Sequence, residues 1–186
     1  MTQEPLSRRA FALVAAAAGL GAAGIAGSVS ADEPPPQTAA SLGISNANAA
    51  IHQEVIFAAS PERLYRTLTD AQLFDKVMLA SGALQAMGLQ STPCQISAEP
   101  GGAFSLFGGY VTGRHIELSP GVRIVQAWRA GSWAPHIYSI ARFELAPHPQ
   151  GVNLSFDHTG IPNDEALSLA TGWRKHYWQP LSKVLA

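Results

Sequence analysis

The sequence contains little cysteine and little charge. Cys94 is the one cysteine among 186 residues, so no disulfide can form within the chain. No histidine or acidic residue lies at catalytic spacing from it, which indicates a buried, unreactive thiol. Charged residues make up 13% of the chain, and the formal net charge is -1. Because nucleic-acid binding depends on many cationic contacts to phosphate, we expect no nucleic-acid partner.

Motifs for phosphate binding, nucleophilic catalysis and metal binding are also absent from the sequence. The glycine pairs at 101–102 and 108–109 flank an expected strand, so they indicate turns rather than a phosphate loop. No G-x-S-x-G pattern occurs. The six histidines form no H-x-H or H-x-x-x-H pair of the kind that zinc sites use. From motifs alone we therefore predict no catalytic residue, no metal and no cofactor.

The N-terminus has the layout of an export signal. Arg8-Arg9 precede a weakly apolar run of alanine and glycine, and Val29-Ser30-Ala31 offers small residues for cleavage. Residues 1–31 are therefore predicted to be a twin-arginine signal peptide, cleaved after about Ala31. The alternative is a retained transmembrane anchor, which the short run and its weak insertion energy disfavour. We expect a periplasmic or otherwise exported protein with no stable membrane insertion after cleavage.

Residues 32–50 predict a flexible linker. Three consecutive prolines, Pro34-Pro35-Pro36, favour an extended polyproline segment. Alanine, serine and asparagine follow with no periodic apolar pattern. Such a segment would hold the following domain away from the membrane or cell wall.

The domain expected over residues 51–186 begins with a strand and two helices. Residues 51–58 are rich in β-forming side chains and predict a strand. Ser60-Pro61-Glu62 combines a capping hydroxyl, a proline at the first helical position and an acid in the first turn, which predicts a helix start. A shorter helix is expected around 71–77. The segment that follows allows either a short helix or a loop.

The stretch from Pro100 to Trp133 organises the rest of the domain. Its glycine pairs and the turn Ser119-Pro120-Gly121 divide it into three expected strands. In the third strand Ile124, Gln126 and Trp128 share one face. The pattern predicts an antiparallel meander. Its three strands cover residues 104–107, 110–118 and 123–129.

Two more strands and a long helix complete the expected domain. Strands are predicted over 137–145 and 152–158, the second with Phe156 and His158 inward. We expect Asn163 to cap the last helix and Pro180 to kink or end it. An apolar stripe follows one helical face, and Trp178 falls outside it, one turn from Arg174. The stripe consists of Ala166, Ala170, Trp173, Tyr177, Leu181 and Val184.

Several of these segments also carry a family resemblance. These segments contain the patterns GG-x-F-S-L-F-G-G, V-T-G-x-x-I-E-L-x-P and I-V-Q-x-W-R, followed later in the chain by Thr159-Gly160-Ile161-Pro162 and Gly172-Trp173. Over roughly residues 51–185 the chain resembles the C-terminal domain of the Hsp90 ATPase activator family, within the START-like, or SRPBCC, superfamily. The resemblance implies an α+β helix-grip fold, in which a curved antiparallel sheet surrounds a long C-terminal helix with a cavity between them.

The first functional hypothesis follows from that implied cavity. An apolar concavity with few polar groups is typical of a small-molecule site, so we expect non-catalytic binding of a hydrophobic small molecule or lipid. Gln126 and His158 would be the polar anchors, although core packing would also explain the tryptophans. The residues expected to line the cavity are Phe104, Leu106, Gln126, Trp128, Phe143, Phe156, His158, Trp173 and Tyr177.

Two alternatives remain open at this point. The resemblance implies a protein partner if the chain acts as an Hsp90-activator-like co-chaperone, although the export signal directs it to a compartment without ATP. The superfamily also includes cyclase and dehydratase enzymes, in which case His158, Asp157 or His115 would act as acid and base. No fixed spacing in the sequence supports the enzymatic alternative.

Overall fold

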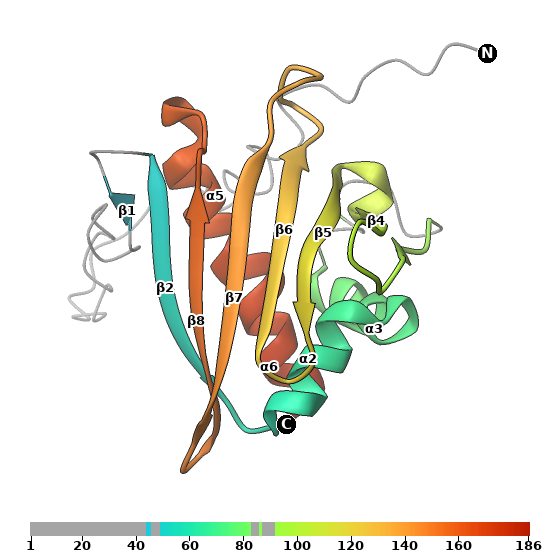
Figure 1. Ribbon diagram of the computed structural model, residues 1–186, viewed down its shortest axis with the longest axis vertical. Helices are drawn as coiled ribbons and strands as arrows, with labels where there is room; N and C mark the ends of the chain where they lie inside the picture. Colours follow the sequence, from blue (N-terminus) through green and yellow to red (C-terminus); the bar gives the residue numbers. More distant parts are fainter. Residues whose placement is uncertain (1–43, 46–48, 83–85, 87–91) are drawn as a thin grey trace, which may run out of the picture.

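A computed structural model describes residues 44–45, 49–82, 86 and 92–186. The expected signal peptide, residues 1–31, lies outside these ranges, as does most of the expected linker. Within the described residues, eight strands form one antiparallel sheet, and a long C-terminal helix lies across one of its faces (Figure 1). This architecture confirms the α+β helix-grip fold.

The strands follow the order β1-β2-β8-β7-β6-β5-β4-β3 across the sheet. Each strand is antiparallel to its neighbours. Their bounds are β1 Ile44–Ser45, β2 Ala50–Phe57, β3 Gln95–Ile96, β4 Ala103–Leu106, β5 Val111–Ser119, β6 Arg123–Ala130, β7 Ser139–His148 and β8 Gly151–Thr159.

The predicted meander is confirmed as β4, β5 and β6. Phe107 does not continue β4, because the short 3-10 turn η2 (Phe107–Gly109) begins there and gives Phe107 a φ of 50°. Buried and half-buried side chains alternate along β6 and β8. Trp128 and His158 therefore point to the inner face, as the period-two pattern predicts.

The sheet also includes two residues from the segment that the sequence suggested was linker. Ile44 and Ser45 pair with Ile51 and Ala50 as strand β1. Ala49 is buried, and its carbonyl oxygen accepts a hydrogen bond from the Ile161 amide at 3.4 Å. Part of residues 32–50 therefore contributes to the folded domain.

The helices α2 (Pro61–Thr69) and α3 (Ala71–Ser81) follow β2. The predicted cap is confirmed, since the Ser60 hydroxyl accepts a hydrogen bond from the Arg63 amide at 3.2 Å. Asp70 caps α3 in the same way through the Leu73 amide. The second helix runs past the predicted end because Val77 and Met78 are buried against the core. It ends at Gly82, which takes the left-handed conformation at φ 65°.

The C-terminal helix is built from four consecutive segments. These are η3 (Asn163–Glu165), α5 (Ala166–Gly172), the π-helical η4 (Trp173–Trp178) and α6 (Gln179–Leu185). The predicted cap at Asn163 is wrong. The chain enters through a 3-10 turn, and no side-chain cap hydrogen bond is made there. None of the described helices is long and apolar enough to cross a membrane.

The helix does not end at Pro180, which was one of the two predicted outcomes. Pro180 lies in the first turn of α6, directly after the π-helical segment. Because the preceding segment is helical, the missing N–H of Pro180 removes one helical hydrogen bond, and the π-helical turn directly before it is the local irregularity at that point. The π-helical turn thus lets the chain continue to Leu185.

The same π-helical turn corrects the prediction for Trp178. Its side chain is buried rather than stacked over Arg174. A π-helix bonds each residue to the fifth one along, so Trp173 and Trp178 lie one above the other. Their rings are stacked with centroids 5.4 Å apart and planes 19° apart.

Candidate functional site

All nine residues predicted to line a cavity are buried between the sheet and the C-terminal helix. Those near β7 and β8 pack directly on one another: the Trp173 ring lies 4.4 Å from Phe156 and 5.8 Å from Phe143, between centroids. Trp128 lies 5.7 Å from Trp173. Two surface pockets formed by described residues both lie outside this ring layer. The β7–β8 end of the interior is therefore filled by side chains.

His158 is the centre of a satisfied polar chain within this layer. The Trp173 indole N–H donates to His158 Nδ1 at 3.0 Å, so Nδ1 carries no proton. Nε2 then carries the proton and donates to the Ser139 hydroxyl at 2.6 Å. That hydroxyl donates to the Trp128 carbonyl oxygen at 3.1 Å. Burial lowers the pKa of His158 to about 3. The ring is neutral and fully bonded, as a core histidine would be.

Asp157 and His158 lie on opposite faces of β8. The Asp157 carboxylate faces outward, where it bonds Arg142 at 3.0 Å and His52 at 2.8 Å. Partial burial raises the pKa of Asp157, but the hydrogen bonds from His52 and Arg142 outweigh it, so the pKa is lowered. These two residues cannot act together on one bound molecule, so the geometry gives no acid–base pair from Asp157 and His158.

A second polar contact, which was not predicted from the sequence, joins β2 to the C-terminal helix. The Gln53 amide donates to the Ala170 carbonyl oxygen at 3.0 Å, and its oxygen accepts from the Trp178 indole N–H. A signal was present in the sequence, since Gln53 occupies the same face of its strand as Ile51. The contact fixes the π-helical turn against the edge of the sheet.

Buried polar atoms without a full hydrogen bond to the protein also lie around the inner face of β5 and β6, beside this ring layer. They include the Trp128 and Trp133 indole nitrogens, the Tyr177 hydroxyl and both ring nitrogens of His115. The Trp128 and Trp133 rings are in contact, with centroids 5.4 Å apart. His115 on β5 pairs with Gln126 on β6, so it shares the inner face with Trp128. We name these four residues the unpaired polar cluster.

The unpaired polar cluster is electrically neutral near pH 7. Burial raises the pKa of the Tyr177 phenol, and an interaction with the nearby Trp128 indole N–H partly offsets this rise. Burial lowers the pKa of His115. Because indoles only donate hydrogen bonds, the cluster supplies more donors than acceptors. It could therefore hold a neutral molecule with acceptor oxygens.

Cys94 and Met78 have structural roles beside this interior. The Cys94 thiol donates to the Ala71 carbonyl oxygen at 2.9 Å, and burial raises its pKa to about 12. This confirms the unreactive thiol. Met78 accepts a hydrogen bond from the Phe107 amide through its sulfur at 3.2 Å. Among the described residues, no three histidine, cysteine or acidic side chains are placed to hold a metal ion.

The buried histidines predict a loss of stability in mild acid. Burial lowers the pKa of His158 to about 3 and that of His176 to about 4. Unfolded histidine binds a proton near pH 6.5, so below that pH the unfolded state holds more protons than the folded state. The free energy of unfolding therefore decreases as the pH is lowered. Between pH 6.5 and its folded pKa, each ring lowers the free energy of unfolding by about 1.4 kcal/mol for each unit that the pH falls. Urea unfolding at pH 7 and pH 5 measures this slope.

A matched pair of variants assigns the pH dependence. In His158→Gln the slope of unfolding free energy against pH should lose the contribution of about one proton, because glutamine does not titrate in this range. His136→Gln changes an exposed ring and should leave the slope unchanged. Equal slopes in the wild type and His158→Gln would contradict the neutral, buried state of His158.

Comparison with known proteins agrees with this fold. The family described as Activator of Hsp90 ATPase homolog 1-like protein matches residues 58–186. Activator of 90 kDa heat shock protein ATPase homolog 2 of Mus musculus is 25% identical over 144 residues, which covers 77% of this chain and 40% of the relative. The Dictyostelium discoideum homologue is 36% identical over 84 residues, or 45% and 22% of the two chains. The chain thus spans less than half the length of these curated relatives.

The solved structures agree on the fold. An HSP90 activator from Plasmodium falciparum superposes with a TM-score of 0.58 at 24% identity, covering 73% of this chain and 94% of that one. Since the family match extends over most of the chain, this protein belongs to the Activator of Hsp90 ATPase homolog 1-like family and has its START-like fold.

Proposed function

We propose that this protein binds a neutral, largely hydrophobic small molecule that carries acceptor oxygens, without transforming it. The single observation that carries the proposal is the unpaired polar cluster. A buried donor without a partner costs about 1–3 kcal/mol, and native proteins leave few such groups. The carbonyl, ether or hydroxyl oxygens of a bound molecule would accept hydrogen bonds from these donors.

The chemistry of the cluster restricts what would bind. Trp128 and Trp133 can only donate, so the guest must accept. The cluster holds no charged side chain, and a lone carboxylate or ammonium buried there would lack a counter-ion. Phe104 and Phe107 border the cluster, with ring centroids 5.4 Å from His115 and 5.3 Å from Tyr177. The guest is therefore an apolar molecule with one or a few neutral oxygens.

The predicted cavity lining divides into two groups under this proposal. Phe104, Leu106, Gln126, Trp128 and Tyr177 would contact the guest. The other predicted residues would form the wall behind it, since none of them belongs to the unpaired polar cluster and their rings pack on one another. These wall residues are Phe143, Phe156, His158 and Trp173.

Native mass spectrometry of protein purified without denaturation tests the proposal. We expect a non-covalent adduct on the wild type. Tyr177→Phe should lose it or hold it at least about tenfold more weakly, because one buried hydrogen bond to the guest disappears. The same variant should fold with a stability within about 1 kcal/mol of the wild type, since the hydroxyl has at most the Trp128 indole N–H as a protein partner.

Tyr138→Phe is the matched control. The Tyr138 side chain is 53% exposed and lies outside the cluster, so this variant should keep the adduct. A wild-type spectrum without an adduct, or an adduct retained by Tyr177→Phe, would refute binding at the cluster.

A second candidate function rests on the names of the relatives. The Mus musculus and Plasmodium falciparum proteins are described as Hsp90 activators, so we infer a protein partner as the alternative. An adduct-free protein that stimulates the ATPase activity of a bacterial Hsp90 would favour this alternative over the first proposal.

We also propose that the chain is exported. The support is the sequence pattern alone, in which Arg8-Arg9 precede a weakly apolar run and small residues. Export would separate the protein from cytoplasmic Hsp90 and ATP, which favours the small-molecule function.

A further inference from the structure

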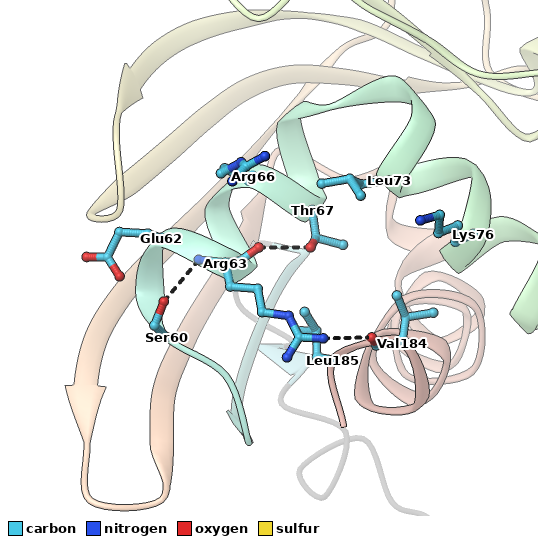
Figure 2. Close-up of a pocket in the computed structure, with 9 residues that line it drawn as sticks. All are labelled: Ser60, Glu62, Arg63, Arg66, Thr67, Leu73, Lys76, Val184 and Leu185. Atoms are coloured by element: carbon cyan, nitrogen blue, oxygen red, sulfur yellow. Dashed lines mark hydrogen bonds between the residues drawn. The ribbon is translucent and has the colours of Figure 1, made fainter.

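A pocket of about 540 Å³ lies between α2, α3 and the end of α6, remote from the unpaired polar cluster. Figure 2 shows side chains from all three helices around it. Its volume falls in the range of small-molecule sites. The lining residues are Ser60, Glu62, Arg63, Arg66, Thr67, Leu73, Lys76, Val184 and Leu185.

The charge of this pocket is opposite in sign to that of the chain. Arg63, Arg66 and Lys76 line it, against the single carboxylate of Glu62, whereas the whole chain has a net charge of -1. Within the described part of the chain, none of the three cations forms an ion pair. Figure 2 shows the Glu62 carboxylate directed away from the centre of the pocket. The pocket therefore has uncompensated positive charge.

One of these cations is held in place by a hydrogen bond, and a second lies across the pocket from it. Arg63 donates to the Val184 carbonyl oxygen at 3.3 Å, which ties α2 to the end of α6. Figure 2 shows the Lys76 amine on the opposite side of the pocket, directed toward its centre. An anion held between α2 and α3 would accept charge-assisted hydrogen bonds from both helices.

The remaining wall of the pocket is apolar. Leu73 is half-buried on α3, and Val184 and Leu185 close the α6 side. Apolar side chains beside unpaired cations suit a molecule with an anionic head group and an apolar part.

We propose that this pocket binds a small amphiphilic anion, with a carboxylate or phosphate head group held by Arg63, Arg66 and Lys76 and its apolar part against Leu73, Val184 and Leu185. This ligand class differs from that of the unpaired polar cluster, which has no cation to receive an anion. The two sites can therefore be tested separately.

Titration with decanoate, followed by the methyl NMR signals of Leu73, Val184 and Leu185, tests the site. We expect saturable shifts of these methyl signals with decanoate and at least about tenfold weaker binding of decanol, which lacks the charge. The double variant Arg66→Ala/Lys76→Ala should weaken decanoate binding by about tenfold or more. Both side chains are exposed on helices, so the variant should fold.

Arg174→Ala is the matched control, because Arg174 is an exposed cation on the C-terminal helix outside the pocket. It should bind decanoate like the wild type. Three outcomes would each overturn the proposal: decanol binding as tightly as decanoate, unchanged affinity in the double variant, or an equal loss in Arg174→Ala. Tyr177→Phe should leave decanoate binding unchanged, which separates this site from the unpaired polar cluster.

Discussion

The Trp173→Ala variant is expected to lose about 3–5 kcal/mol of unfolding free energy, a large part of the total of a domain this size. Trp173 contacts the rings of Phe156, Trp178 and Tyr177, and its N–H is the donor to His158 Nδ1. Truncation would open a cavity and leave a buried acceptor unpaired. Urea unfolding, followed by far-UV circular dichroism, measures the loss.

Two further variants serve as comparisons for the loss of unfolding free energy in Trp173→Ala. Leu167→Ala removes a side chain that is 56% exposed on α5 and should change the stability by no more than about 0.5 kcal/mol. Trp173→Phe keeps an aromatic ring but deletes the indole N–H, so its cost should fall between the two. A loss below about 1 kcal/mol in Trp173→Ala would mean that the ring layer is loosely packed.

The second large effect is expected for Gly113→Ala on β5. A methyl group there would overlap the carbonyl oxygen of Ala127 and the ring of Phe104. The carbonyl belongs to the paired strand β6, so it cannot move without breaking the ladder. We expect a loss of at least about 3 kcal/mol, toward the upper end of overpacking effects. Thermal unfolding would show it as a strongly lowered midpoint.

Gly101→Ala is the comparison for this substitution. Gly101 has a φ of +82° but no heavy atom within 4 Å of the added methyl group. Its cost should therefore be only the backbone strain of about 1–2 kcal/mol. If Gly113→Ala were no worse than Gly101→Ala, the close approach of Phe104 to β5 would be wrong.

Local patterns predicted much of the fold correctly. The period-two alternation identified the inner face of β6 and β8, and the Ser60-Pro61 pair identified the start of α2. These predictions succeed because alternation and capping depend on neighbouring residues alone. The predictions for Asn163 and Trp178 failed because a 3-10 entry and a π-helical turn override ordinary α-helical spacing.

The candidate sites could not be predicted from the sequence, because they are formed by contacts between segments that are distant in the chain. Trp128 and Tyr177 come from a strand and a helix that are far apart in sequence, and nothing near either residue indicates that its polar atom stays unpaired. Arg66 and Val184 likewise reach one pocket only because α3 packs against both α2 and α6.

The sequence by itself determined the central strands, the start of α2 and the family, since these follow from short-range sterics and ordered motifs. Only the tertiary structure decided which rings fill the interior, which polar atoms lack partners and where three cations meet. Those outcomes depend on how the sheet and the helices pack together, which no local pattern encodes.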